Sequence, residues 1–400
     1  MRARWISGLA LLALPGAAGA RAPAPTPAPT VEQVVVVMRH GVRPPTKDPA
    51  MPAGFASQAW PAWPVAPGWL TPHGARAVGL LGTADARLFK AQGLLPARGC
   101  PAPGRLVVVA DSDQRTIATA QAWTRTLAPG CAIKADHLAQ DVEDPRFNAI
   151  AHGLAPFDPA AVDAGVAQAV GPGGLAARDA QMQPLTARLN AILCGAAKTG
   201  CGVDHKPTSI APATPGQKPK LAGTLDRAST AAQILLLEYA EGKPMHDVGW
   251  GRASAADVTA LSQFHALEFA LLARPRAVAA PGFAGLAPIV RQGLTGPARI
   301  TMIAGHDTNV ANLAGLIHAH WQVPGFAADD PAPGGAFIIE RLRGTGGRPL
   351  VRVRYRAQTL DAIRTLAPRA PVSVPVPLPA CALPGQPMVC PLDKFLALLG

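Results

Sequence analysis

The sequence predicts an α/β fold in which a doubly wound, mostly parallel sheet is interrupted by an α-helical cap domain, with the functional site in the cleft between them. Three short runs of β-branched and aliphatic residues, at 34–37, 105–110 and 299–304, have the composition of strands buried on both faces. Each run is followed by a loop and a helical pattern, the order that builds a parallel sheet. Because the runs come from both ends of the chain, the segment between them is expected to be an insertion.

The first strand leads into a basic loop. Within residues 34–47, four valines predict the strand, and the glycine and paired prolines that follow cannot continue it. The chain therefore turns at the carboxyl end of the strand, where open parallel sheets bind ligands. Arg39 and Arg43 flank His40 at this turn, and two guanidinium groups beside an imidazole suit a phosphate or carboxylate group. The alternative is a solvated basic turn without a ligand.

The second strand repeats this arrangement. Before it, residues 70–92 have a helical pattern, with Thr71 as the expected cap and Pro72 in the first turn. The strand itself, at 105–110, leads through a polar loop into a helix that begins near Arg115.

The middle of the chain has a different pattern. Residues 137–250 consist of Ala-rich helical stretches broken by polar, Pro-rich loops, and they predict the α-helical cap domain. The α/β core then comprises residues 31–136 and 251–400. Strand character returns in the second part of this core, at 336–342 and 350–356.

A second motif follows the third strand. Residues 305–309 are Gly-His-Asp-Thr-Asn, and the next residues have helical periodicity. His306 and Asp307 are therefore expected at a strand end and a helix start, where free N–H groups favour an anion. The alternative is that Asp307 only caps the helix and His306 is a satisfied buried imidazole. Two other strand ends carrying Arg or His favour the functional interpretation.

The first thirty residues are expected to lie outside the folded protein. Arg2 and Arg4, an apolar run at 6–14 and small residues up to Ala20 are typical of a secretory signal peptide cleaved after about Ala20. Residues 21–30 form a Pro-rich leader. The apolar run is too short to span a bilayer, so we expect a periplasmic or secreted protein without a membrane span.

Six cysteines fit an oxidising compartment. Other connectivities remain open, but sequential pairs close the shortest loops, and each pair lies beside Pro or Gly. The expected pairs are Cys100 with Cys131, Cys194 with Cys201, and Cys381 with Cys390. Because no Cys-x-x-Cys occurs, neither a metal nor a redox cofactor is expected.

The charge of the chain favours an anionic partner. The formal net charge is +12, and loss of Arg2 and Arg4 with the signal peptide leaves +10. The basic residues are scattered singly, without the aromatic-interleaved helix or finger spacing of proteins that bind nucleic acid. We therefore expect a monomeric protein that binds a small anionic molecule.

Together the motifs resemble the histidine acid phosphatases, specifically the bacterial periplasmic branch that contains phytases and glucose-1-phosphatases. The likeness covers nearly the whole mature chain. The matching segments are residues 39–47, 60–64, 68–71, 113–116, 248–251, 305–309 and 381–395.

The resemblance implies an acid phosphatase that hydrolyses phosphomonoesters without a cofactor. His40 would attack phosphorus and carry a phosphohistidine. Asp307 would protonate the leaving alkoxide and then assist water. The residues that would hold the phosphoryl oxygens are Arg39, Arg43, Arg115 and His306. Since a general acid must carry its proton, activity is expected to be highest in acid and to fall as Asp307 ionises towards neutral pH.

The resemblance also suggests a substrate. Thr46 and Lys47 match the phytase form of the first motif, where they help to bind the phosphorylated inositol ring, although Lys47 is alternatively an ordinary loop lysine. His265 occupies a phytase-like place, and Thr308 is assigned to substrate binding beside the acid. Gln233 stands where relatives carry an acidic pocket residue.

Other segments favour a different specificity. Residues 279–281 hold no counterpart of a further phytase arginine, and residues 114–120 look more like the glucose-1-phosphatase loop. The expected function is therefore a phytase, and the alternative is a sugar-phosphate phosphatase similar to glucose-1-phosphatase. A non-catalytic periplasmic phosphate-binding protein is disfavoured because both His40 and Asp307 are present.

Overall fold

The computed structural model describes residues 1, 30–197 and 200–400. The predicted signal peptide and the leader up to residue 29 lie outside the described residues, whereas Thr30 already belongs to the first strand. Within the described part of the chain, no helix combines the length and apolar character that a membrane span requires.

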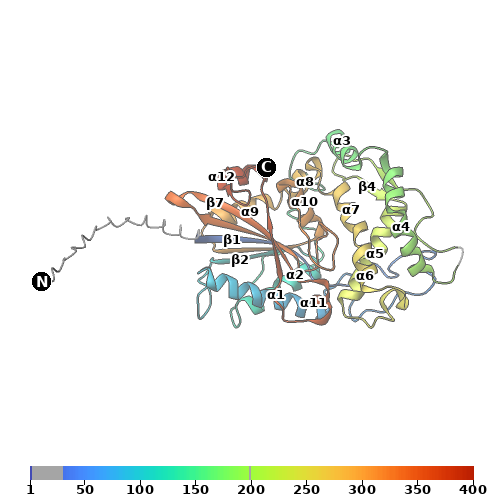
Figure 1. Ribbon diagram of the computed structural model, residues 1–400, viewed down its shortest axis with the longest axis horizontal. Helices are drawn as coiled ribbons and strands as arrows, with labels where there is room; N and C mark the ends of the chain where they lie inside the picture. Colours follow the sequence, from blue (N-terminus) through green and yellow to red (C-terminus); the bar gives the residue numbers. More distant parts are fainter. Residues whose placement is uncertain (2–29, 198–199) are drawn as a thin grey trace.

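A seven-stranded sheet forms the centre of the α/β half of the molecule (Figure 1). Its order is β2-β5-β1-β6-β7-β8, and β9 also pairs with β7. The strands are β1 (Thr30–Arg39), β2 (Leu106–Ala110), β5 (Ile300–Gly305), β6 (Ala336–Arg343), β7 (Pro349–Ala357), β8 (Val372–Val376) and β9 (Cys390–Pro391). The three strands that precede the sequence motifs are therefore neighbours, with β5 between β2 and β1.

The sheet is mixed, so the prediction of a mostly parallel sheet needs a correction. Strands β2, β5 and β1 run parallel. In contrast, β6 is antiparallel to β1, and β7 is antiparallel to β6, β8 and β9. The physical reason is the short connection at residues 344–348, since so few residues can join only antiparallel strands. The parallel half carries both sequence motifs.

Helices cover both faces of the sheet, as a doubly wound fold requires. They are α1 (Pro72–Ala91), α2 (Gln114–Leu127), α8 (Arg276–Phe283), α9 (Ala287–Thr295), α10 (Asp307–Ile317), α11 (Leu360–Thr365) and α12 (Leu392–Leu398). The predicted start of α1 is confirmed, because the Thr71 side chain accepts a hydrogen bond from the N–H of Gly74 and Pro72 is the first helical residue.

The alternating valines of β1 explain why both faces are covered. Val34 and Val36 belong to the core cluster that contains Trp123 of α2. Val35 and Val37 belong to the opposite cluster, which contains residues of α9 and α10. Each of these valines is essentially inaccessible to solvent, and burying one such side chain contributes about 1.5–3 kcal/mol. This burial fixes the position at which β1 ends and the His40 loop begins.

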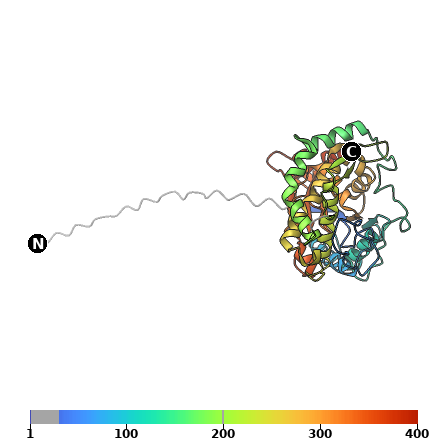
Figure 2. The ribbon, with the colours of Figure 1, turned by 90° about the vertical axis from the view of Figure 1, so that its right-hand side faces the viewer.

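A second layer of helices lies beyond the carboxyl ends of the parallel strands. It contains α3 (Pro159–Val170), α4 (Gly174–Cys194), α5 (Thr224–Ala240), α6 (Ala255–Leu261) and α7 (Gln263–Leu272), a hairpin of β3 (Ser209–Ala211) and β4 (Lys220–Ala222), and a short 3-10 turn, η1 (Val248–Gly251). Figure 2 views the molecule from this side, with the green and yellow helices in front of the strands. Because α6 and α7 also pack against α5, helical structure continues past residue 250. The predicted domain limits remain a prediction.

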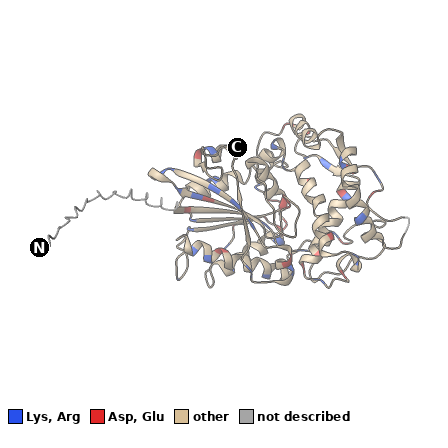
Figure 3. Ribbon diagram, viewed as in Figure 1, with Lys and Arg blue, Asp and Glu red and all other residues tan. Residues whose placement is uncertain are grey.

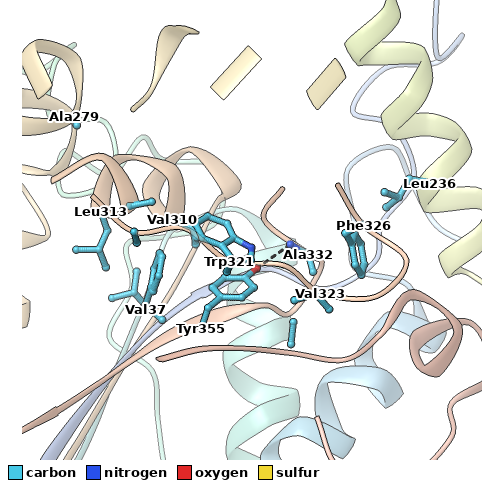
Figure 4. Packing of buried hydrophobic residues seen from close by; sticks show 14 of the residues in the cluster. Val37, Leu236, Ala279, Val310, Leu313, Trp321, Val323, Phe326, Ala332 and Tyr355 are labelled. Carbon is cyan, nitrogen blue, oxygen red and sulfur yellow. Dashed lines mark hydrogen bonds between the residues drawn. The ribbon is translucent and has the colours of Figure 1, made fainter. Parts of the chain in front are cut away.

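An aromatic cluster supports the loop that borders the site. Trp321 stacks on Tyr355, with ring centroids 4.4 Å apart, and Phe337 meets Tyr355 edge-on. The Tyr355 hydroxyl accepts a hydrogen bond of 2.9 Å from the backbone N–H of Ala332 (Figure 4). The cluster therefore fixes the loop at residues 331–335 against the sheet.

The three predicted disulfides are all present, with Cα–Cα distances of 5.5, 5.7 and 5.3 Å for Cys100–Cys131, Cys194–Cys201 and Cys381–Cys390. Lys and Arg lie on the sheet half and on the helical half alike (Figure 3).

Candidate active site

The two sequence motifs meet at adjacent strand ends. Arg39, the last residue of β1, is in register with Gly305, the last residue of β5. The backbone N–H of His40 donates a hydrogen bond of 2.9 Å to the Gly305 carbonyl, and the N–H of Gly334 donates one of 3.1 Å to the His40 carbonyl. The backbone of His40 is therefore held on both sides by strands and loops of the core.

The His40 imidazole is oriented and kept neutral. Its Nδ1 lies 2.8 Å from the Gly41 carbonyl, and because a carbonyl only accepts, Nδ1 carries the proton and Nε2 keeps its lone pair. Burial lowers the pKa of His40 well below its usual value, and the charges of neighbouring cations lower it further. These cations are Arg43, Arg115, Arg39 and His306. A neutral imidazole with a free Nε2 is a competent nucleophile in acid.

Arg39 connects the nucleophile loop to three other segments. Its side chain is 1% exposed. Nη1 donates to the Pro331 carbonyl at 2.5 Å. Nη2 donates to Gln233 Oε1 at 3.0 Å and pairs with Asp307 Oδ2 at 2.9 Å. The guanidinium therefore ties β1 to α5, to α10 and to the loop at 331–335.

Three arginines leave hydrogen-bond donors open at this site. Arg43 Nη1 donates to the Pro44 carbonyl at 2.9 Å, and Arg115 Nη2 donates to Asp113 Oδ2 at 2.6 Å. The Nε–H groups of Arg39, Arg43 and Arg115 are buried, yet no group among the described residues accepts from them. A buried donor without an acceptor is costly, so these three groups favour an anion with several oxygens.

The crowding of positive charge has a measurable consequence. Burial, together with the charge of Arg115, lowers the pKa of Arg43 to about 10. The pKa of a guanidinium falls this far where other cations lie close to it in a desolvated site. An anionic ligand would relieve both effects.

His306 is held by a carboxylate that the sequence motifs did not single out. Its Nε2 lies 2.6 Å from Asp111 Oδ2, and its ring lies 5.7 Å from the His40 ring in an edge-to-face arrangement. Burial alone would raise the pKa of Asp111, but its interactions with His306, Ser112 and Arg115 outweigh burial and lower it. Asp111 could have been recognised from its position directly after the second strand, but only Arg and His were considered at the strand ends.

Asp307 lies in a strongly positive environment. Burial would raise its pKa, but the guanidinium groups of Arg39 and Arg43 and the neighbouring imidazole of His265 outweigh burial and hold that pKa well below its usual range. Asp307 Oδ1 accepts from the Thr308 N–H at 2.9 Å.

His265 reaches the same carboxylate from α7. Its Nε2 is 3.7 Å from Asp307 Oδ2. Its Nδ1 lies 2.6 Å from Asp330 Oδ1, and Asp330 is itself buried. This second carboxylate was not anticipated, since Asp330 lies in a loop with no motif around it.

The remaining predicted substrate residues lie around this centre. Thr46 and Lys47 are both exposed. Thr46 and Arg115 both lie against Gly68, since a Cβ on Gly68 would be 3.5 Å from the Thr46 methyl and 3.6 Å from Arg115 Nη1. Thr308 follows Asp307 in α10 and is among the residues that line a pocket.

One group of side chains has the composition of a metal site. Asp111, Asp113 and His306 present ligand atoms within 4.8 Å of one another. All three are already engaged, because Asp111 holds His306 and Asp113 pairs with Arg115. We assign these carboxylates to the orientation of His306 and Arg115.

This site and fold define a phosphoric monoester hydrolase that uses histidine. The chain belongs to the histidine phosphatase superfamily (branch 2), whose family profile matches residues 30–160. A phytase of Escherichia coli K12, AppA, is 32% identical over 91% of this chain and 90% of its own length. A glucose-1-phosphatase of Salmonella typhimurium is 29% identical over 91% of each chain.

Solved structures give the same result for the fold. The phytase from Citrobacter braakii superposes with a TM-score of 0.85 at 30% identity, covering 93% of this chain and 97% of that one. Hafnia alvei phytase in complex with myo-inositol hexakis sulphate superposes with a TM-score of 0.84 at 31% identity, covering 94% and 97%.

Proposed function

We propose that the protein is an acid phosphatase with phytase activity, which acts through a phosphohistidine at His40. The observation that carries this proposal is the convergence of the Arg39, Arg43 and Arg115 guanidinium groups on the neutral imidazole of His40. A phosphoryl group offers three peripheral oxygens to such donors, while its fourth bond is left free to break.

In the first step, His40 Nε2 forms a bond to phosphorus as the bond from phosphorus to the ester oxygen breaks. Asp307 gives its proton to the departing alkoxide, so the leaving group departs as a neutral alcohol. The ring becomes a phosphorylated imidazolium. It keeps the proton on Nδ1, and this N–H still donates its hydrogen bond to the Gly41 carbonyl. The three arginines stabilise the charge that develops on the peripheral oxygens.

In the second step, water attacks the phosphohistidine. The Asp307 carboxylate takes a proton from this water, and the bond from phosphorus to His40 Nε2 breaks to restore the neutral imidazole. Asp307 thus ends the cycle protonated, as it began. The ion pair with Arg39 and the approach of His265 keep this carboxylate in place through both steps.

The need for a protonated Asp307 sets the pH range of activity. The neighbouring cations favour its ionised form, whereas a bound phosphate adds negative charge beside it and raises its pKa again. We therefore expect kcat to be highest in acid and to fall towards neutral pH. A flat profile of kcat from about pH 3 to 8 would contradict this role.

Phytate is the proposed substrate. The exposed Thr46 and Lys47 border the arginine cluster and add a positive charge outside the scissile position. Relatives of this length include enzymes named phytase and glucose-1-phosphatase, so a sugar phosphate is the second candidate. Export to the periplasm or the medium is supported by the three disulfides, and a monomer remains our expectation.

The test is phosphate release by the purified protein at about pH 4.5 from phytate, glucose 1-phosphate and p-nitrophenyl phosphate in parallel. A kcat/KM led by phytate would support the proposal, and one led by glucose 1-phosphate would support the sugar-phosphate phosphatase. Release from none of the three would favour a phosphate-binding protein. Asp307→Asn should reduce turnover of phytate far more than that of p-nitrophenyl phosphate, whose leaving group needs no proton; equal losses would contradict the general acid.

A further inference from the structure

A pocket of about 320 Å³ opens beside α10, the helix that begins at Asp307. Its walls come from residues 147–151, from the segment 216–220 that leads into β4, and from α7, α8 and α10. Thr308, the residue after Asp307, lines this pocket. The pocket therefore adjoins the carboxylate that faces the leaving group.

Two lysines of the segment 216–220 line this pocket. Lys218 is exposed. Desolvation by the surrounding protein nevertheless lowers the pKa of its ammonium group, and the charges of Asp307 and Glu268 offset only part of this effect. Lys220 lies near Asp226, because its charge lowers the pKa of that carboxyl together with Arg227 and Lys47. Among the ion pairs of the described residues, neither lysine has a carboxylate within contact distance.

The carboxylates near these lysines are themselves only weakly available. Burial raises the pKa of Glu268, whose Oε2 accepts from the Ser229 hydroxyl at 2.5 Å. Burial also raises the pKa of Asp226. In acid both groups therefore tend towards their neutral forms and compensate less of the positive charge of Lys218 and Lys220.

The pocket also offers an unused acceptor. Asn312, on α10, lines the pocket and is 3% exposed, and its Oδ1 has no donor among the described residues. A hydroxyl group is a suitable donor for a carboxamide oxygen. The ammonium groups that line the pocket suit an anion such as a phosphate of a polyol.

We propose that Lys218 and Lys220 form a second phosphate subsite, which binds a phosphate of the substrate other than the one attacked by His40. This inference rests on the proposed function and names the class of substrate: polyols that carry several phosphates. Lysine suits such a subsite because its ammonium group is a point charge that accepts phosphate in several orientations. A monophosphate cannot use it, so these lysines determine specificity and take no part in the chemical step.

The experiment measures binding of a polyanion without requiring its hydrolysis. The probe is myo-inositol hexakissulfate, used as an inhibitor of p-nitrophenyl phosphate hydrolysis at about pH 4.5 in the parent and in the double variant Lys218→Ala, Lys220→Ala. The inhibition constant should rise at least about tenfold, and inhibition by inorganic sulfate should change less than about twofold. Lys394→Ala, which removes an exposed lysine on α12, is the matched control, and Lys218→Arg with Lys220→Arg should restore binding.

Two results would overturn the subsite. One is an unchanged inhibition constant for the hexakissulfate in the double variant. The other is an equal loss for inorganic sulfate and for p-nitrophenyl phosphate turnover, which would place the effect at the catalytic centre or in folding. Failure of the proposed function is a separate result, because it is seen in the parent as absence of phosphate release from phytate.

Discussion

Gln233 and Asp307 share one hydrogen-bond donor, so a substitution at Gln233 should change the pKa of Asp307. Both Gln233 Oε1 and Asp307 Oδ2 lie within hydrogen-bonding distance of Arg39 Nη2, at 3.0 and 2.9 Å. In Gln233→Glu, a second carboxylate would compete for the same guanidinium and repel the charge of Asp307. Both effects favour protonated Asp307, so its pKa should rise.

The size of the shift follows from these distances. Two oxygens that share one donor in this way lie at most about 6 Å apart, and two unit charges at that separation repel by about 3 kcal/mol at an effective dielectric constant of about 20. This energy corresponds to about two pKa units. Since the positive charge of Arg39 offsets part of this repulsion, we expect the alkaline limb of kcat to move up by about one to two pH units.

The assay is the pH dependence of kcat at saturating substrate, because kcat reports groups in the enzyme–substrate complex. The substrate should be glucose 1-phosphate or phytate, whose alkoxide leaving groups need the proton. Gln233→Leu removes the hydrogen bond to Arg39 without adding charge, and it should move the limb by much less. A rise in KM is expected in Gln233→Glu, since the added charge opposes an anionic substrate.

The reasoning would be refuted by a limb that stays within about 0.3 pH units of the parent or moves to lower pH. An equal shift in Gln233→Leu would also refute it, because the charge would then be irrelevant.

Three further changes test other features. His40→Ala should reduce phosphate release from every substrate by at least about 10⁴-fold, and a loss under tenfold would exclude His40 as nucleophile. Burial raises the pKa of Glu238 to about 8, so the folded state keeps a proton that the unfolded state releases, and stability is lost as pH rises from about 4.5 to 8. Urea denaturation should therefore show Glu238→Gln gaining a few kcal/mol over the parent at about pH 7.5 relative to pH 5, whereas equal differences at both pH values would contradict this. Asp85→Ala leaves the buried Arg356 unpaired and should cost about 3–5 kcal/mol of unfolding free energy; an unchanged urea midpoint would show that the pair contributes nothing.

The parallel half of the sheet was predictable because its strands are continuous apolar runs. Four successive valines have no arrangement in water other than burial on both faces, and the breakers after His40 mark where the strand must end. The same logic applied to β5 and Asp307. His40 and Asp307, the proposed nucleophile and acid, were therefore located at strand ends without knowledge of the fold.

Strands β6 and β7 of the antiparallel half were also predicted, but its outer strands and the outer contacts of the site could not be found in this way. Strand β8, with the sequence Val-Ser-Val-Pro-Val, contains a proline, and β9 is only two residues long. Neither therefore has a sequence pattern that predicts a strand. Asp330 is hydrogen-bonded to His265 although the two residues are far apart in the sequence. Only tertiary packing brings them together. Lys218 and Lys220 lie in a segment whose prolines predicted no more than a loop.

The order of the strands also constrains how the protein can be made. Strand β1 has β5 on one edge and β6 on the other, and β5 begins only at residue 300. During synthesis, both edges of β1 therefore remain unpaired, and its four valines remain exposed to water, until β5 and β6 have been made. Such a state is prone to aggregation. The same order means that a nascent chain carries His40 long before it acquires Asp307, so the two groups proposed for hydrolysis can meet only after β5 has been made.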